Sequence, residues 1–364
     1  MATVDPKRAG VDEAEWKRAT ASYYALRVRE VVEETSDARS FVLDVPDELK
    51  ATFAYAPGQF LSFAIPFDGK VLVRSYSLAS SPHFDAAHKF TVKRIADGRV
   101  SNWMNDTIRA GDTLMVTPPA GLFLLDDADS KIVLFSGGSG ITPVISIIKS
   151  ALVTSARPLK LVYANRNAAS IIFAAELERL ARAHSGRFAL VHSLDEVDGF
   201  LGLEDVVRHV EGAIDAEFYL CGPGAFMATV EGALEELGVH RQRIHVEHFA
   251  SPPDPDAEGA KPAALPEAGG ASAPASIHVA LDGAVHEVPC APGESVLQAA
   301  RRAGLDPPFS CEEGYCSCCM AKLVEGEVRM KANDCLTPEL LEEGWVLTCQ
   351  SRCVSPKIRI EYPD

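Results

Sequence analysis

Short runs of alternating apolar and polar residues dominate the first third of the chain. Runs such as "ARSFVLDV", "QFLSFAI" and "KFTVKRI" are separated by Gly, Pro and Asp residues. A period of two broken by turn-forming residues is typical of half-buried strands in an antiparallel sheet. The pattern therefore predicts a small antiparallel β-barrel over residues 23–127.

The pattern changes over residues 128–250, where continuous apolar runs alternate with stretches of helical period. The strand-like runs are "KIVLFSGGSG", "LKLVYANR", "FALVHSL", "AEFYLCGPG" and "RIHVEHF". The helix-like stretches between them are "TPVISIIKSALV", "AAELERLARAHS" and "AFMATVEGALEELG". Regular alternation of this kind predicts an α/β domain with a doubly wound parallel sheet.

Residues 251–276 are rich in Pro, Ala and Gly and show no apolar period. This composition predicts a semi-extended linker. A third domain is then expected over residues 277–364, with "IHVALDGAVHEVP" as a hairpin and "SVLQAARRAGL" as a helix.

Composition narrows the function without defining it. The 364 residues suffice for several domains, and the formal net charge of −16 argues against nucleic acid or an anionic membrane as the main partner. No apolar run has the length of a membrane span, and the N-terminus lacks the apolar core of a signal peptide. We therefore expect a cytoplasmic protein, with a monomer as the default.

Four of the nine cysteines crowd into "FSCEEGYCSCCMAKLVEGEV". In the reducing cytoplasm, such a cluster favours metal binding over disulfides. Cys311, Cys316 and Cys319 are followed after 29 residues by Cys349, a spacing typical of plant-type [2Fe–2S] sites. Gly314 would allow the loop to approach a cluster closely. A zinc site that uses Cys353 stays open as an alternative.

Residues 277–364 as a whole resemble a plant-type ferredoxin domain of β-grasp fold. The resemblance implies that Cys311 and Cys316 hold one iron and that Cys319 and Cys349 hold the other. It assigns no role to Cys318, Cys335 or Cys353.

"RSYSL" at residues 74–78 resembles a signature of the ferredoxin–NADP reductase superfamily, whose barrel binds a flavin. The resemblance implies that Arg74 holds the FAD pyrophosphate, that Tyr76 packs on the flavin and that Ser77 addresses its N5 atom. Taken alone, the pentapeptide could equally be an ordinary amphipathic strand. The nearby "VKRIADGRVSNWM" supports the flavin interpretation, and the cofactor-binding residues implied by both motifs are Arg74, Ser75, Tyr76, Ser77, Leu78, Val92, Lys93, Gly98, Val100 and Ser101.

"FSGGSGITP" and "YLCGPGAFM" resemble the two nucleotide-binding segments of the same superfamily. Glycines between a strand and a helix let the backbone approach a pyrophosphate. The resemblance implies contacts from Gly138, Ser139, Gly140, Thr142, Cys221, Gly222 and Pro223. It also places Glu247 and Phe249 near the flavin, which makes Ser77, Cys221 and Glu247 the candidate catalytic residues. Cys221 could instead be a buried thiol at a strand end, and His245 and His248 are expected to face solvent.

The choice of nucleotide is less clear from the residues. Ser193 is not followed by an Arg that could hold a 2′-phosphate, and Asp195 is nearby. These residues favour NADH, while Arg166 leaves NADPH possible.

The domain order resembles the reductase components of multicomponent oxygenases, and the motifs are most similar to those of the 3-ketosteroid 9α-hydroxylase reductases. The resemblance implies electron transfer from NADH through FAD and a [2Fe–2S] cluster to a terminal oxygenase of Rieske type. The phenylacetyl-CoA epoxidase reductases share the architecture and are an alternative. A non-enzymatic electron carrier or a zinc-binding module is an alternative of another class.

Overall fold

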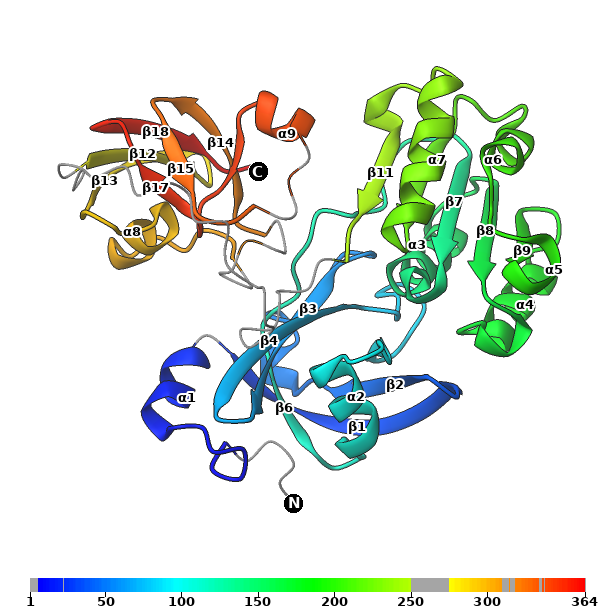
Figure 1. The fold of residues 1–364 in the computed structure, drawn as a ribbon, viewed down its shortest axis with the longest axis horizontal. Helices are drawn as coiled ribbons and strands as arrows, with labels where there is room; N and C mark the ends of the chain where they lie inside the picture. The colour runs from blue at the N-terminus through cyan, green and yellow to red at the C-terminus, as the bar shows by residue number, and fades with distance from the viewer. Residues whose placement is uncertain are drawn as a thin grey trace. The chain divides into compact units, whose positions relative to one another are not determined.

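The computed structural model describes residues 6–21, 23–249, 275–309, 314, 318–333, 336 and 338–363. The chain divides into two compact units, Met1–Phe249 and Ala250–Asp364 (Figure 1). Most of the predicted linker lies outside the described residues. The first strand of the second unit begins at Ala275, so it includes the last two residues of the predicted linker.

The first domain is the predicted antiparallel barrel. Its strands are β1 (Tyr24–Thr35), β2 (Ala38–Asp44), β3 (Phe60–Phe67), β4 (Lys70–Ser77), β5 (His88–Lys93) and β6 (Thr113–Val116). They form one sheet in the order β4-β3-β6-β1-β2-β5, and a bridge between Leu78 and Phe90 joins its two edges. Phe90 packs at the centre of the core, 4.4 Å from Phe63 and 5.2 Å from Phe41 between ring centroids.

Two helices and a 3-10 turn accompany the barrel: α1 (Glu13–Ala19), η1 (Asp47–Leu49) and α2 (Arg99–Thr107). Asp12 caps α1 by accepting hydrogen bonds from the first turn. The sequence pattern predicts no helix at α2. Its N-cap is Gly98, whose lack of a capping side chain removes the usual sequence signal for a helix start.

The second domain is the predicted parallel sheet. Its strands are β7 (Ile132–Gly137), β8 (Leu159–Asn165), β9 (Phe188–Leu194), β10 (Glu217–Cys221) and β11 (Ile244–Glu247), in the order β11-β10-β7-β8-β9. The chain winds outward from β7 to β9 and then returns to the other side of β7. The strand order therefore reverses between β7 and β10, and ligands bind at such a switch point in open α/β sheets.

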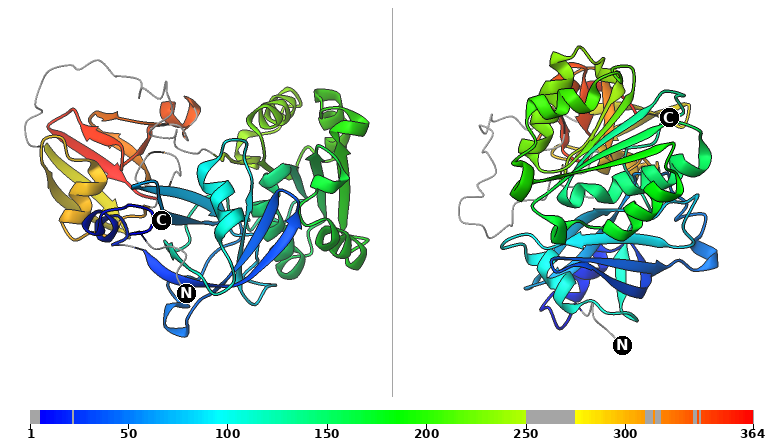
Figure 2. Two further views of the ribbon diagram at one scale, coloured as in Figure 1. Left: turned by 60° about the horizontal axis from the view of Figure 1, so that its bottom comes forward. Right: turned by 90° about the vertical axis from the view of Figure 1, so that its right-hand side faces the viewer.

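Helices cover both faces of this sheet (Figures 1 and 2). The helices and 3-10 turns are η2 (Gly138–Gly140), α3 (Ile141–Thr154), η3 (Ala168–Ser170), α4 (Ala174–Ala183), α5 (Asp195–Asp198), α6 (Leu203–Val210), α7 (Gly224–Glu236) and η4 (Arg241–Arg243). Helices α3 and α4 pack on the face that carries Ile132 and Leu134. Helices α6 and α7 pack on the face that carries Val133 and Phe135. Among the described helices, none is long and apolar enough to cross a lipid bilayer.

The second unit has the predicted β-grasp fold. Its main sheet contains β12 (Ala275–Leu281), β13 (Ala284–Cys290), β14 (Met320–Glu325), β16 (Trp345–Leu347) and β18 (Lys357–Glu361), in the order β13-β12-β18-β14-β16. A small sheet pairs β15 (Val328–Met330) with β17 (Ser351–Cys353), and the helices are α8 (Val296–Arg302) and α9 (Pro338–Glu342). Helix α8 buries Val296 and Ala299 in the core formed by the main sheet.

Candidate cofactor sites

The expected flavin motif lies on β4 and just beyond it. Ser77 and Leu78 are buried, whereas Ser75 is exposed and its hydroxyl lies 2.8 Å from that of Ser62 on β3. The half-buried Tyr76 ring packs 6.0 Å from Phe90, and burial raises the pKa of its phenol. β4 thus presents Arg74 and an un-ionised aromatic ring along one edge of the barrel.

The second flavin motif lies beside the first. Arg99, the first residue of α2, has its Nη2 atom 3.4 Å from Asp68 Oδ2 and its guanidinium 5.2 Å from the Phe67 ring. The start of α2 therefore lies against the turn between β3 and β4. No side chain caps this helix, so its first N–H groups can bind an anion such as a phosphate.

Space around this helix start is tight. A Cβ atom on Gly98 would lie 2.5 Å from Ser101 Oγ and 3.1 Å from the Ile95 carbonyl oxygen, so a side chain there would crowd both. The side chains of Val100 and Ser101 are buried and fix the turn, which leaves their backbone N–H groups to face a bound phosphate. Val92 is fully buried on β5, and its carbonyl already accepts a hydrogen bond from Asn105 Nδ2 at 3.1 Å.

The two expected nucleotide-binding segments meet at the switch point. A Cβ atom on Gly140 would lie 2.0 Å from the carbonyl oxygen of Cys221, so the loop after β7 rests directly on the turn after β10. A Cβ atom on Gly222 would lie 2.9 Å from Gly137 N. Gly138 has a φ of 52°, in the left-handed region, and its carbonyl accepts a hydrogen bond from Tyr163 Oη at 2.9 Å.

Within the first segment, Thr142 Oγ1 donates a hydrogen bond to the Ser139 carbonyl at 3.0 Å. This bond holds the loop closed at the start of α3. The glycine-rich backbone is thereby pre-shaped before any ligand binds.

Two acidic groups with unusual environments lie at the carboxyl end of the sheet. Cys221 and Glu247 are register partners on β10 and β11. Burial raises the pKa of the Cys221 thiol, and the neighbouring Glu247 raises it further. Burial also raises the pKa of Glu247 to about 8. Both groups are therefore mostly uncharged near neutral pH.

The other two residues expected near the flavin lie at different depths. Ser77 is buried on β4, in the barrel, whereas Phe249 is exposed as the last described residue of the first unit. Cys221 stands on β10, in the other domain of the same unit.

A pocket of about 380 Å³ opens at the carboxyl ends of the parallel strands. Residues of both nucleotide segments line it, and so do Lys93 from the barrel, Asn165, Arg166, Asp195 and Phe200. Lys93, expected at the flavin, thus lies at the nucleotide pocket, and burial lowers the pKa of its ammonium group. The pocket is built from both domains.

Asn165 makes the strongest case that this pocket receives a polar ligand. Its side chain is 5% exposed, and neither atom of its amide has a hydrogen-bond partner. A buried amide without partners costs free energy unless a ligand or water satisfies it. The sequence alone does not distinguish Asn165 as a binding residue, because an Asn at a strand end is also common in turns.

The residues that bear on nucleotide choice lie at or near the same pocket. Arg166 Nη2 pairs with Asp37 Oδ2 of the barrel at 2.8 Å, so its charge is balanced within the protein. Asp195 lines the pocket, and Ser193 is 8% exposed.

In the second unit, two of the four expected iron ligands converge. The Cys349 N–H lies 3.5 Å from Cys319 Sγ, and Thr348 donates a hydrogen bond from its hydroxyl to the Cys319 carbonyl at 2.9 Å. Both cysteines are buried, at 2% and 5% exposure. Cys311 and Cys316 lie outside the described residues.

Gly314 and the apolar side chains beside the two cysteines are compatible with the expected cluster site. Gly314 has a φ of 90°, and a Cβ atom there would lie 3.1 Å from the Ala332 carbonyl oxygen. An apolar shell that includes Leu297, Leu336 and Leu347 surrounds the two cysteines. Paired thiols in a dry shell suit iron–sulfur ligation.

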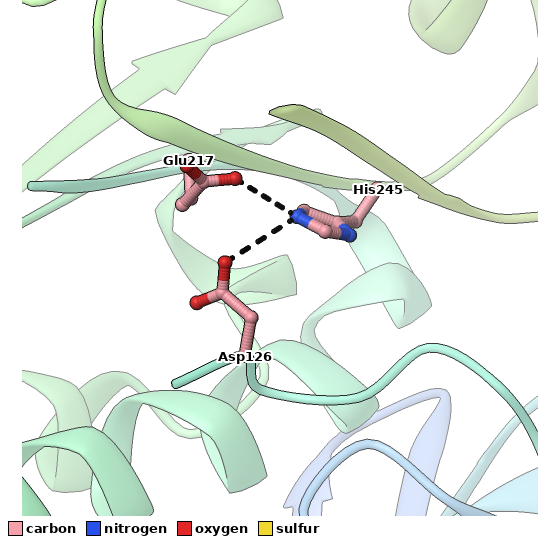
Figure 3. A group of neighbouring side chains, drawn as sticks. All are labelled: Asp126, Glu217 and His245. Carbon is pink, nitrogen blue, oxygen red and sulfur yellow. Dashed lines mark hydrogen bonds and ion pairs between the residues drawn. The ribbon is translucent and has the colours of Figure 1, made fainter. Parts of the chain in front are cut away.

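The expectation that His245 faces solvent is wrong. Its ring stacks on Tyr219 at 4.5 Å, and its Nε2 atom lies 3.2 Å from Glu217 Oε2 and 3.9 Å from Asp126 Oδ2 (Figure 3). The ligand atoms of the three side chains lie within 4.8 Å of one another, which is close enough to share a metal ion. However, the carboxylates also pair with Arg157 and Arg243, so we assign the group to an ion-pair network that anchors the segment after the barrel.

Family models match the three domains in order. A model of the oxidoreductase FAD-binding domain matches residues 25–124, one of the oxidoreductase NAD-binding domain matches residues 134–232, and one of the 2Fe-2S iron-sulfur cluster binding domain matches residues 279–354. Together with the sites above, these matches define the class. The protein is an NAD(P)H-dependent flavin iron–sulfur oxidoreductase that uses FAD, NADH and a [2Fe–2S] cluster.

Comparison with whole proteins narrows the class. The ferredoxin reductase component of 3-ketosteroid-9-alpha-monooxygenase from Rhodococcus rhodochrous is 46% identical, over 93% of this chain and 96% of the relative. One component of the 1,2-phenylacetyl-CoA epoxidase from Escherichia coli is 31% identical, over 94% of this chain and 98% of the relative. The chain therefore belongs to the family of oxygenase reductase components.

The solved structure of phthalate dioxygenase reductase has the same fold. It matches 94% of this chain and 99% of its own length, with a TM-score of 0.57 and 23% sequence identity. The likeness extends over all three domains.

Proposed function

We propose that this chain delivers electrons from NADH to the terminal component of a 3-ketosteroid 9α-monooxygenase, a Rieske-type oxygenase. The observation that supports this oxygenase partner is the 46% identity to the Rhodococcus rhodochrous reductase along nearly the full length of both chains. The epoxidase relative is 31% identical over a similar length, which makes an epoxidase partner the second candidate.

We assign the residues as follows. Arg74 and the uncapped start of α2 hold the anionic phosphates of FAD, and Tyr76 and Ser77 lie along its ring system. Bound FAD supplies the conversion between a two-electron hydride donor and one-electron acceptors. The backbone around Gly138 and Gly140 holds the nucleotide pyrophosphate, with Lys93 as a nearby cation.

Cys221 and Glu247 have a different task. Because burial raises the pKa of each group, neither carries a full negative charge near neutral pH. They therefore provide a neutral wall beside the nicotinamide position and exclude water from it. Cys319 and Cys349 supply two of the four thiolates for the cluster, and we assign the other two to Cys311 and Cys316.

We propose NADH as the preferred donor. Arg166 is paired with Asp37, and the Asp195 carboxylate at the pocket would repel a 2′-phosphate. Asp195→Ala should raise kcat/KM for NADPH about 3- to 10-fold with little change for NADH, which is the size of one partly screened charge interaction. An unchanged ratio of kcat/KM values would show that Asp195 does not select the nucleotide.

Reconstitution tests the proposed partner. The purified chain is mixed with the oxygenase component of a 3-ketosteroid 9α-monooxygenase or with the catalytic components of a phenylacetyl-CoA epoxidase, and product formed per NADH is measured. The proposal expects coupled turnover with the steroid enzyme and little with the other. Equal or better coupling with the epoxidase would contradict the steroid assignment while leaving the reductase activity intact.

We further propose that the chain acts as a cytoplasmic monomer, with domain limits at 23–127, 128–250 and 277–364. The formal charge of −16 supports a soluble protein that meets a basic surface on its partner. Light scattering of the purified chain at several concentrations measures the oligomeric state, and a dimer mass would overturn that part.

A further inference from the structure

Helix α3 connects the nucleotide loop to the barrel. It begins directly after Gly140, and three of its polar side chains, Ser146, Lys149 and Ser150, are fully buried. A helix buried in a core usually carries apolar residues at such positions. Their burial therefore calls for specific partners.

The partners lie on the barrel, in the three residues that follow the "RSYSL" motif. Ser146 and Lys149 donate hydrogen bonds to main-chain carbonyls there, and the two serine hydroxyls at the end share a third bond. The bonds are Ser146 Oγ to Ser80 O at 2.6 Å, Lys149 Nζ to Ala79 O at 2.9 Å, and Ser150 Oγ with Ser81 Oγ at 2.7 Å. The segment that directly follows the flavin motif is therefore hydrogen-bonded to helix α3.

Charge pairs reinforce these bonds. Lys149 Nζ lies 2.7 Å from Asp85 Oδ2 of the barrel and 3.2 Å from Glu176 Oε1 of α4. Glu176 also pairs with Lys89 of the barrel at 3.1 Å. Burial alone would raise the pKa of Glu176, but the two lysines outweigh it and hold the pKa below its usual value. Each domain therefore contributes one carboxylate and one lysine to the network.

We propose that Lys149 is a positioning residue that fixes the flavin motif relative to the nucleotide loop and so sets the rate of hydride transfer between their ligands. The proposal rests on the residue assignments made above for the two motifs. Apolar side chains could hold two domains together equally well, since buried ion pairs contribute little net stability. Directional bonds to a defined stretch of backbone add what apolar contacts lack, a single register of one domain on the other.

The functional reason is the geometric demand of the reaction. A displacement of about 1 Å between reacting groups can cost about 100-fold in rate. Two cofactors held by different domains are exposed to this risk whenever the domains slip. The Lys149 network prevents such a shift. Lys149 lies on α3, the helix that begins at the nucleotide loop, and it bonds to Ala79, the residue that directly follows the flavin motif.

The test compares Lys149→Met with the matched control Lys160→Met in the full FAD-loaded protein. Lys160 also donates to a main-chain carbonyl, that of His209 at 2.8 Å, but this bond lies wholly within the nucleotide domain. Anaerobic stopped-flow absorbance measures the NADH dissociation constant and the limiting rate of flavin reduction separately. Hydrogen exchange, which needs no turnover, measures protection of residues 78–85 and 141–154.

For Lys149→Met we expect the limiting rate to fall about 10- to 100-fold, while the NADH dissociation constant changes by less than about 3-fold. Exchange should accelerate in both named segments, and Lys160→Met should match the wild type in all three measurements. If Lys149→Met fails to fold, Ser146→Ala decides by the same split, because it removes one bond and leaves the charges paired.

An unchanged limiting rate in a folded, FAD-loaded variant with faster exchange would overturn the proposal, since the network would then be structural only. A loss of NADH affinity with an unchanged limiting rate would also overturn it. If the wild-type protein itself is not reduced by NADH, the assignment of the reductase activity fails instead, and the two failures are thereby distinguished.

Discussion

Replacing Gly140 with alanine tests whether the two nucleotide-binding segments must touch. Gly140 has φ −59° and ψ −12°, a conformation that alanine adopts readily, so backbone strain does not enter. The new Cβ atom would lie 2.0 Å from the Cys221 carbonyl oxygen and 2.4 Å from its carbon. To restore an ordinary contact, the loop after β7 and the turn after β10 must separate by about 1.4 Å.

That separation displaces the nucleotide loop from the wall formed by Cys221 and Glu247. Overpacking of this kind costs about 1–3 kcal/mol of folding free energy, and a displacement of this size is expected to slow flavin reduction by NADH about 100-fold. Anaerobic stopped-flow at the flavin band measures the rate, and thermal unfolding measures the stability.

Gly232→Ala is the matched control. Gly232 lies within α7 of the same domain, and nothing lies within 4 Å of a Cβ atom added there. Alanine should stabilise the helix by about 0.5–1 kcal/mol and leave the rate unchanged. Gly140→Ala protein that is reduced by NADH at the wild-type rate would refute the claim that close contact of the two segments positions the nucleotide.

Three further predictions concern single residues. Burial raises the folded-state pKa of Glu247 from 4.5 to about 8, so between these pH values the unfolded chain releases a proton that the folded protein keeps. The stability of the wild type should therefore fall relative to that of Glu247→Gln from pH 5 to pH 8, and a stability difference that is equal at both pH values would show that the pKa of Glu247 is not raised. Cys349→Ser should lose the cluster but keep FAD and its reduction by NADH, as measured by iron content and stopped-flow, and retention of full iron would exclude Cys349 as a ligand. Gly314→Ala should lower the iron content of the purified protein, because alanine disfavours a φ of 90° and its Cβ atom would crowd the Ala332 carbonyl; an unchanged iron-to-protein ratio would show that the loop tolerates the change.

The strands of this protein were largely predictable from sequence because its apolar runs are short and bounded by turn-forming residues. The runs that contain Phe41, Phe63 and Phe90 each form a barrel strand. The continuous runs after residue 130 form the parallel strands, whose burial on both faces requires them to be apolar throughout. Helix α2 escaped prediction because Gly98 gives no capping signal.

The sites were predictable only in part. Resemblance supplied the candidate residues, and the structure brings Gly140 against Cys221 and Cys319 against Cys349. The resemblance could not predict the contacts between domains, because those contacts depend on how separately folded surfaces pack together. Sequence reasoning therefore did not place Lys93 in the pocket that the nucleotide segments line.

The sequence around Lys149 contains a signal for its buried ion pairs that the sequence-based prediction did not use. It is the single charged residue in the stretch "TPVISIIKSALV", on an otherwise apolar helix. A lone charge in such a stretch must find a buried partner or leave the core. Its partners, at residues 79 and 85 and on α4, are distant in sequence, so they can be identified only from the folded structure.

The most direct test of the whole account is an anaerobic titration of the full chain with NADH, followed by visible absorbance and electron paramagnetic resonance, and then by addition of oxidised 3-ketosteroid 9α-monooxygenase oxygenase component. We predict that the flavin and iron–sulfur bands bleach together, that the resonance of a reduced [2Fe–2S] cluster appears, and that this resonance disappears when the oxygenase is added. A flavin that bleaches while the cluster stays oxidised, or a protein that contains zinc and no iron, would contradict it.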